Sequence, residues 1–223
     1  MAGFVGRLFA VISGGEWPER KAVEEVLARA EAIIACDSGM LWARQNDVFP
    51  QYLVGDMDSV DGETLAYFVH QGAQTERLSP YKDETDTEEG VALALHLGAE
   101  EIAFIGGTGK RLDHSLGNLH VMYRLLKKDV PCVLEGREER VFCTRSSLPL
   151  LGMEGHTISV LPLFEDCQVS LHGFRYPLDH YDYRCGRTIG VSNVALENRA
   201  MVEIHQGSAF VFVNRVRIPD PQG

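Results

Sequence analysis

The first two thirds of the chain alternate short apolar runs with segments of helical periodicity, and this alternation constrains the fold more than any other feature. The strand candidates are residues 7–12, 33–36, 51–54, 101–105, 130–134 and 140–143. The helical segments start at Pro18, span 63–71, start at the capping pair Thr85 and Glu88, and span 113–128. Alternation of this kind favours a parallel sheet with helices on both faces.

The pattern changes after about residue 147. Short strand candidates at 157–161, 167–171, 201–205 and 209–213 are separated by Gly, Pro, Asn and Asp, and no helical segment intervenes. This texture is typical of an antiparallel β-sandwich. We therefore expect an α/β protein of two domains: a parallel-sheet α/β domain over residues 1–146 and a small antiparallel β-sandwich over 147–223.

The charge balance restricts the partners that the chain can bind. Its 223 residues include 21 Lys and Arg against 32 Asp and Glu, which gives a net charge of -11. An acidic chain repels polyphosphate backbones, so we expect no nucleic-acid partner. A nucleotide site would need local positive charge or a divalent cation.

The cysteines and the apolar runs bear on location. The five cysteines are odd in number and scattered, which suits a reducing compartment better than a disulfide framework. No apolar run approaches the roughly 20 residues that span a bilayer, and no secretory leader is recognisable. We expect a cytoplasmic protein with no membrane partner.

An acidic segment, Gly55-Asp56-Met57-Asp58-Ser59, follows the third strand candidate. Residues two apart in an extended segment point to the same side, so Asp56 and Asp58 would direct their carboxylates to one spot. Open α/β sheets bind ligands beyond the carboxyl ends of their strands, where this segment lies. Taken alone, the segment could equally be a polar turn.

A second acidic segment, Lys82 to Thr87, places Asp83 and Asp86 near one face of the first turn of the next helix. Two carboxylates ~4 Å apart repel each other by ~4 kcal/mol at an effective dielectric of about 20. Gathering four aspartates at one sheet edge is therefore costly unless a cation lies between them. Hard oxygen ligands favour Mg²⁺, which usually also contacts substrate phosphates.

A glycine-rich turn, Gly106 to His114, joins the next strand candidate to a helix. Such a turn lets backbone amides approach an anion, and Lys110 and Arg111 would supply local positive charge. It is neither a Walker motif, because Arg follows Lys110, nor a dinucleotide fingerprint, because Leu112 takes the last glycine position. Ser13-Gly14-Gly15 offers a second, weaker phosphate loop.

In order and spacing, the two acidic segments and the turn from Gly106 to His114, together with Asn118, resemble the signature segments of thiamine pyrophosphokinases. Residues 171–178 and Val191-Ser192-Asn193 are similar to the C-terminal segments of that family, and the likeness spans roughly residues 10 to 215. The resemblance implies transfer of the diphosphate of ATP to the hydroxyl of thiamine, with thiamine diphosphate and AMP as products. It also implies an N-terminal ATP/Mg²⁺-binding catalytic domain, a C-terminal thiamine-binding domain, and a homodimer with active sites at the subunit interface.

Carried over residue by residue, the resemblance makes Asp56, Asp58 and Asp86 the Mg²⁺ ligands. The residues implied on the nucleotide side are Gly14, Gly15, Asp37, Ser59, Gly109, Arg111, Asp113, His114 and Asn118. Those implied on the substrate side are Lys82, Asp83, Ser192 and Asn193, the last two offered across the interface by the second subunit. Asp83 is our candidate for orienting or deprotonating the thiamine hydroxyl, and Arg111 for adding charge at the phosphates.

Two other functions fit part of the pattern. A Mg²⁺-dependent diphosphokinase acting on another small heterocyclic alcohol, such as a pterin, would use the same acidic and glycine loops. A non-catalytic thiamine or nucleotide sensor would not need so costly a metal cluster. Aromatic stacking from the C-terminal domain must use Phe or Tyr, because both tryptophans, Trp17 and Trp42, lie near the N-terminus. We expect His180, Tyr181 and Tyr183 to lie in a solvated loop.

Overall fold

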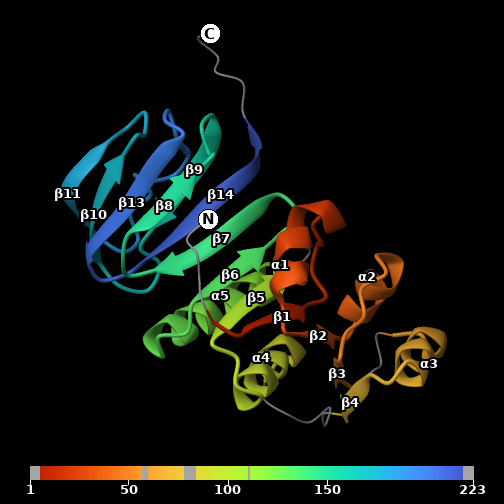
Figure 1. Cartoon of the computed structure of the whole chain (residues 1–223). Helices are drawn as coiled ribbons and strands as arrows, with labels where there is room; N and C mark the ends of the chain where they lie inside the picture. Colours follow the sequence, from red (N-terminus) through yellow and green to blue (C-terminus); the bar gives the residue numbers. More distant parts are fainter. Residues whose placement is uncertain (1–5, 57–59, 78–83, 110, 218–223) are drawn as a thin grey trace. The chain divides into compact units, whose positions relative to one another are not determined.

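The computed structural model describes residues 6–56, 60–77, 84–109 and 111–217 (Figure 1). The chain divides into two compact units between Arg137 and Glu138. The first unit is the parallel α/β part of the chain, and the second is built of antiparallel strands.

The sheet of the first unit has the strand order β6-β5-β1-β2-β3-β4, and every neighbouring pair is parallel. Its strands are β1 (Leu8–Ile12), β2 (Ala32–Cys36), β3 (Tyr52–Gly55), β4 (Gln74–Arg77), β5 (Glu101–Ile105) and β6 (Cys132–Glu135). The chain moves outward from β1 to β4 and then returns to the other side of β1 with β5. The strand order therefore reverses between β1 and β5, where open α/β sheets bind their ligands.

Helices cover both faces of this sheet, as the sequence predicts. They are η1 (Arg20–Val23), α1 (Glu24–Arg29), α2 (Gly39–Gln45), α3 (Gly62–His70), α4 (Asp86–His96) and α5 (Leu112–Lys127). On one face, Val26 of α1, Trp42 of α2 and Phe68 of α3 share a core with alternate residues of β1 and β2. On the other face, Gly90 of α4 lies against Val11.

The second unit is a β-sandwich. One antiparallel sheet has the order β12-β9-β14-β7 and the other β11-β10-β13-β8. The strands are β7 (Glu139–Thr144), β8 (Leu148–Leu151), β9 (His156–Leu161), β10 (Cys167–His172), β11 (Leu178–Tyr183), β12 (Asn193–Val194), β13 (Arg199–Gln206) and β14 (Ala209–Arg217). Buried side chains of both sheets, such as Val160, Val169 and Val211, form one core. The predicted fold class is confirmed.

Two features differ from the sequence-based expectation. The structural division falls before β7 rather than after residue 146, because β7 pairs with β14 over its whole length. The prediction of a solvated loop at 180–183 was wrong: these residues belong to β11, which pairs with β10, and Tyr183 is only 1% exposed. Alternating polar residues hid this strand in the sequence.

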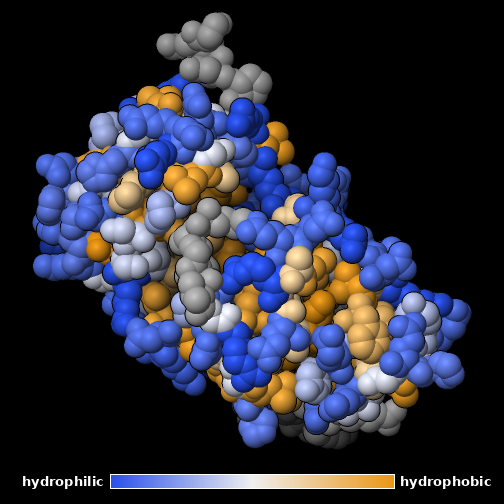
Figure 2. Space-filling view, in the orientation of Figure 1, coloured by the Kyte–Doolittle hydropathy of each residue, from blue (hydrophilic) through white to orange (hydrophobic). Residues whose placement is uncertain are grey.

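Hydrophilic residues cover much of the face shown in Figure 2, in keeping with the acidic composition. Hydrophobic residues emerge between them. Of the helices in the described part of the chain, none is both long enough and apolar enough to cross a membrane.

Candidate active site

The loops that follow β1 and β5 are joined at the point where the strand order reverses. The amide of Gly15 donates to the Gly106 carbonyl at 2.8 Å, and the amide of Glu16 donates to the Thr108 carbonyl at 2.7 Å. These bonds continue the β1–β5 pairing past the strand ends. The floor of the site is therefore ordered backbone from two glycine-rich turns.

This joint requires glycine at position 15. A Cβ atom there would lie 2.3 Å from the Gly106 carbonyl oxygen and 2.4 Å from that of Thr108, and both are backbone atoms. Gly106 has a φ of +74°, and a Cβ atom on it would lie 2.2 Å from Cδ1 of Trp17. Trp17 is itself fixed, because its indole donates to the Ser13 carbonyl at 2.6 Å.

If the site binds ATP, as the resemblance implies, replacing Gly15 with alanine should raise the KM for ATP about tenfold, because the two turns must move apart to admit the Cβ atom. The substitution Gly14→Ala should have a smaller effect, since its Cβ would meet only the Ser38 hydroxyl, at 2.5 Å. Steady-state kinetics with ATP varied would measure both. Equal effects of the two substitutions would contradict the importance of the joint.

A cleft of about 520 Å³ opens above these turns. It is lined by the loops after β1, β2 and β5, by the start of α4 and by the first two turns of α5. The residues from the sequence prediction that line it are Gly14, Gly15, Asp37, Asp86, Gly109, Arg111, His114 and Asn118. Six hydroxyl residues that the prediction did not assign also line the cleft: Ser13, Ser38, Thr85, Thr87, Thr108 and Ser115. Ser38, Thr85 and Thr87 are direct sequence neighbours of the predicted residues Asp37 and Asp86, and this adjacency could have indicated them.

Asp37 is held in an uncommon backbone conformation at the end of β2. Its φ is +44°, and its amide donates to the Val54 carbonyl of β3 at 3.1 Å. The carboxylate lies so close to Gly55 that a Cβ atom there would be 1.9 Å from Oδ1. The absence of a side chain at Gly55, the residue before Asp56, thus makes room for the Asp37 carboxylate.

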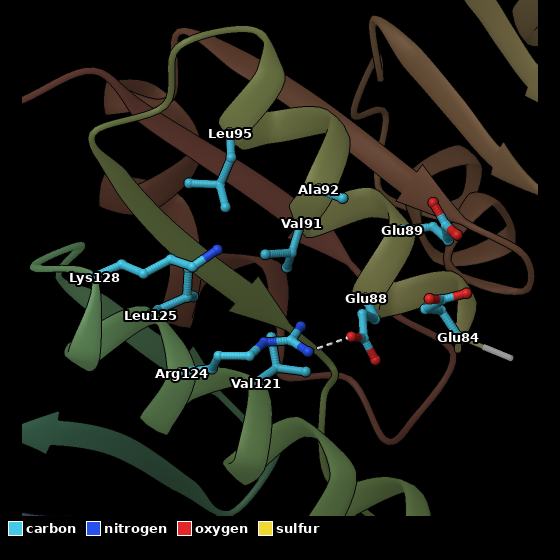
Figure 3. A pocket seen from close by; sticks show the side chains of 10 residues that line it. All are labelled: Glu84, Glu88, Glu89, Val91, Ala92, Leu95, Val121, Arg124, Leu125 and Lys128. Carbon is cyan, nitrogen blue, oxygen red and sulfur yellow. Dashed lines mark ion pairs between the residues drawn. The ribbon is translucent and has the colours of Figure 1, made fainter.

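Asp86 begins α4, whose position is fixed at several points. The Thr85 hydroxyl accepts from the Glu88 amide at 3.2 Å and caps the helix, and the Thr87 hydroxyl donates to that of Ser13 at 3.0 Å. The Glu88 carboxylate does not return to Thr85 but pairs with Arg124 of α5 at 2.5 Å, as Figure 3 shows. The Thr85 side chain thus caps the helix as predicted, but the reciprocal bond of the predicted Thr85–Glu88 capping box is not formed because Arg124 takes the Glu88 carboxylate.

Positive charge lies at the start of α5. Arg111 precedes the helix, and its guanidinium donates to the Asp113 carboxylate at 2.5 Å and 3.2 Å. This hydrogen bonding holds the pKa of the Asp113 carboxyl below its usual value. Together with the positive end of the 16-residue helix, Arg111 makes this side of the cleft suited to an anion. Asp113 itself does not line the cleft.

Asn118 supports the glycine turn. Its side chain is 6% exposed, and Nδ2 donates to the Gly107 carbonyl at 2.7 Å. This bond ties the second turn of α5 to the floor of the cleft.

The two predicted acidic segments lie only partly within the described residues. Asp58, Ser59, Lys82 and Asp83 lie outside the described residues, and Asp56 is exposed but does not line the cleft. Within the described ranges, no three His, Cys, Asp or Glu side chains are grouped so as to hold a metal ion.

The remaining predicted residues belong to the second unit. Asn193 is 5% exposed, and its Oδ1 accepts from the amides of Tyr176 and Val194 at 3.1 Å and 2.9 Å. Its Nδ2 donates to the Tyr176 carbonyl at 2.8 Å. Asn193 thus holds the backbone of Tyr176, whose side chain is 65% exposed. Ser192 is exposed and has a φ of +58°.

The first unit is an open α/β domain of parallel strands, with a cleft over two glycine-rich turns at the switch point of its sheet. Residues 23–134 match the family model described as "Thiamin pyrophosphokinase, catalytic domain". Residues 145–209 match the family model described as "Thiamin pyrophosphokinase, vitamin B1 binding domain". The chain belongs to the thiamine pyrophosphokinase family. It carries both of the domains that these descriptions name.

Individual relatives of the chain are also thiamine pyrophosphokinases. The chain is 25% identical over 177 residues to thiamine pyrophosphokinase of Bacillus subtilis (strain 168), which covers 78% of this chain and 83% of the relative. It is 28% identical over 176 residues to thiamine pyrophosphokinase 1 of Arabidopsis thaliana, covering 72% of this chain but only 64% of that protein. The crystal structure of the Bacillus subtilis enzyme shares the fold, with a TM-score of 0.81 at 22% identity, covering 93% of this chain and 98% of that one.

The predicted family and enzyme class are thereby confirmed, and neither the pterin diphosphokinase nor the sensor is favoured.

Proposed function

We propose that the chain transfers the diphosphate of ATP to the hydroxyl of thiamine, and that ATP binds in the cleft of the first unit. The observation that carries this proposal is the joint between the β1 and β5 turns, in a cleft whose lining also includes Arg111, Asp37 and Asp86. Glycine turns allow phosphates to approach backbone amides closely. Arg111 would supply the charge that offsets their repulsion from an acidic chain.

We propose that Asp56, Asp58 and Asp86 hold Mg²⁺. Asp86 lines the cleft, and the Asp37 carboxylate lies against Gly55, the residue before Asp56. Carboxylate oxygens are the ligands that Mg²⁺ prefers, so the chemistry of the proposed donor set fits this ion. Bound there, Mg²⁺ would neutralise negative charge on the phosphate oxygens.

In the proposed reaction, the thiamine hydroxyl oxygen forms a bond to the β-phosphorus of ATP. The bond between that phosphorus and the oxygen bridging to the α-phosphorus breaks, and AMP leaves with the electron pair. The chain's part is mainly to orient the groups and to stabilise charge. Asp83 stays our candidate for accepting the hydroxyl proton.

We propose that the second unit binds thiamine at Ser192 and the exposed Tyr176, with Asn193 holding the backbone of Tyr176 and with Lys82 also contributing. An exposed aromatic ring on a fixed backbone suits stacking against a cationic heterocycle. We also propose a homodimer in which the second subunit offers these residues. In its support, the segment around Ser192 exposes the apolar side chains of Ile189 (59%) and Val191 (48%). A cytoplasmic location remains a prediction from the cysteine content.

The direct test identifies the products. With Mg²⁺, ATP and thiamine, AMP and thiamine diphosphate should form in equal amounts, because the diphosphate moves in one step. Ion-exchange chromatography separates AMP from ADP and the thiamine phosphates from each other. Accumulation of ADP or of thiamine monophosphate would contradict the proposal, and AMP formation with a hydroxymethyl pterin in place of thiamine would favour the alternative substrate.

A further inference from the structure

The two sheets of the second unit are connected by an exposed segment that leads directly to Ser192. This crossover loop (residues 184–192) leaves β11 in one sheet and enters β12 in the other. All of its residues are exposed except Gly190. Its path therefore depends on how that one buried residue is held.

Gly190 is held from both sheets. Its amide donates to the hydroxyl of Tyr183, in β11, at 2.8 Å, and its carbonyl accepts from the amide of Val160, in β9, at 2.9 Å. A side chain at this position has no room, since a Cβ atom would lie 2.2 Å from the Val160 carbonyl oxygen. The Tyr183 hydroxyl also donates to the Arg187 carbonyl at 3.3 Å, so one phenol binds two points of the loop.

The Tyr183 hydroxyl is buried, so water cannot take its place as the acceptor for the Gly190 amide. Tyr183 is 1% exposed and packs in the sandwich core, and burial raises the pKa of its phenol. Without this oxygen the buried Gly190 amide would lose its acceptor, which costs free energy and favours a different loop path. The near end of the loop is fixed separately, because Asp166 accepts from the Cys185 amide at 2.8 Å and from Arg184 at 2.9 Å.

We infer that Tyr183 is a positioning residue for thiamine binding: through Gly190 it fixes the crossover loop and thereby places Ser192, two residues further on. This inference rests on the proposed function. Ser192 itself has a φ of +58°, and its amide donates to the Ser159 hydroxyl at 3.0 Å, so a shift of Gly190 would displace a residue whose backbone conformation is already restricted.

The test compares Tyr183→Phe with Tyr181→Phe. Both remove one phenolic oxygen from β11, and the two rings pack edge to face with centroids 6.0 Å apart, but it is Tyr183 that binds the loop backbone. Tyr183→Phe should raise the KM for thiamine about tenfold while the KM for ATP changes by less than about twofold. Tyr181→Phe should change neither.

A second measurement needs no catalysis. Arg184 and Arg187 make the crossover loop a substrate for trypsin, so the rate of cleavage there, followed by mass spectrometry, reports its local opening. Cleavage should be faster by about tenfold in Tyr183→Phe and unchanged in Tyr181→Phe. Gly190→Ala, which displaces the same residue sterically, should give both changes if Tyr183→Phe folds poorly.

The inference requires both changes in a folded variant. Faster cleavage with an unaltered KM for thiamine, or a raised KM with unaltered cleavage, would overturn it. If the wild-type protein formed no thiamine diphosphate, the proposed function would fail on that result, and cleavage would still decide whether Tyr183 controls the loop.

Discussion

Replacing Asp86 with asparagine is expected to lower kcat about a thousandfold while leaving the fold intact. Asp86 lines the cleft at the start of α4, and it is the proposed Mg²⁺ ligand that the described residues place in the cleft wall. The melting temperature without Mg²⁺ should stay nearly level, because lower repulsion among the carboxylates opposes the loss of about 0.3–1 kcal/mol of helix-dipole stabilisation.

Glu89→Gln is the matched control. It removes the same charge from the first turn of the same helix, but Glu89 lines the groove between α4 and α5 shown in Figure 3 rather than the cleft. Steady-state rates at saturating ATP and Mg²⁺, together with thermal melts of both variants, make the comparison. Near-normal turnover in Asp86→Asn would remove Asp86 from the metal site, and an equal loss in Glu89→Gln would assign the effect to helix charge alone.

The elements that the sequence predicted correctly carry their own signals. The cap at Thr85 forms as expected, and the long helix predicted at 113–128 is α5, Leu112–Lys127. The central strands are uniformly apolar because both of their faces are covered: every residue of β1, β2 and β5 is buried. In these segments local preference and burial agree.

The elements that were missed depend on their surroundings. Helix α2 begins at Gly39 without a side-chain cap, and burial of Met40 and Trp42 in the core stabilises it. Strand β4 has the sequence QTER and pairs only with β3 among the strands described, so main-chain bonds at a sheet edge decide its conformation. Neither feature leaves a hydrophobic period that could be recognised beforehand.

The candidate site likewise contains residues that the sequence indicated and contacts that it could not indicate. Strand ends and glycine turns indicated Gly15, Asp86 and Arg111, because the carboxyl ends of parallel strands must meet at one edge, whereas Asp37 was implied by the family resemblance alone. The hydrogen bonds that Asn118 and Asn193 make to the backbone could not be predicted, since each joins segments whose proximity is a result of folding. Both asparagines support the backbone of their sites through these hydrogen bonds, so substituting them would disturb more than a ligand contact.

Asn193→Ala should therefore abolish nearly all activity. It leaves the partly buried amides of Tyr176 and Val194 without the oxygen that binds both, and the loss of these two hydrogen bonds frees the backbone of this segment. The exposed ring of Tyr176 would then lose its fixed support. A thermal melt would establish that the sandwich still folds, and a normal KM for ATP would show that the first unit is unaffected.

Mixing this variant with Asp86→Asn tests the proposed homodimer. If each active site combines the first unit of one chain with the second unit of its partner, a mixed dimer has one site with both substitutions and one with neither. Random exchange of equal amounts makes about half of the dimers mixed, so roughly a quarter of wild-type activity should return. A site contained within one chain cannot be restored by mixing. Activity that stays absent after native mass spectrometry has shown exchanged subunits would therefore confine the site to a single chain.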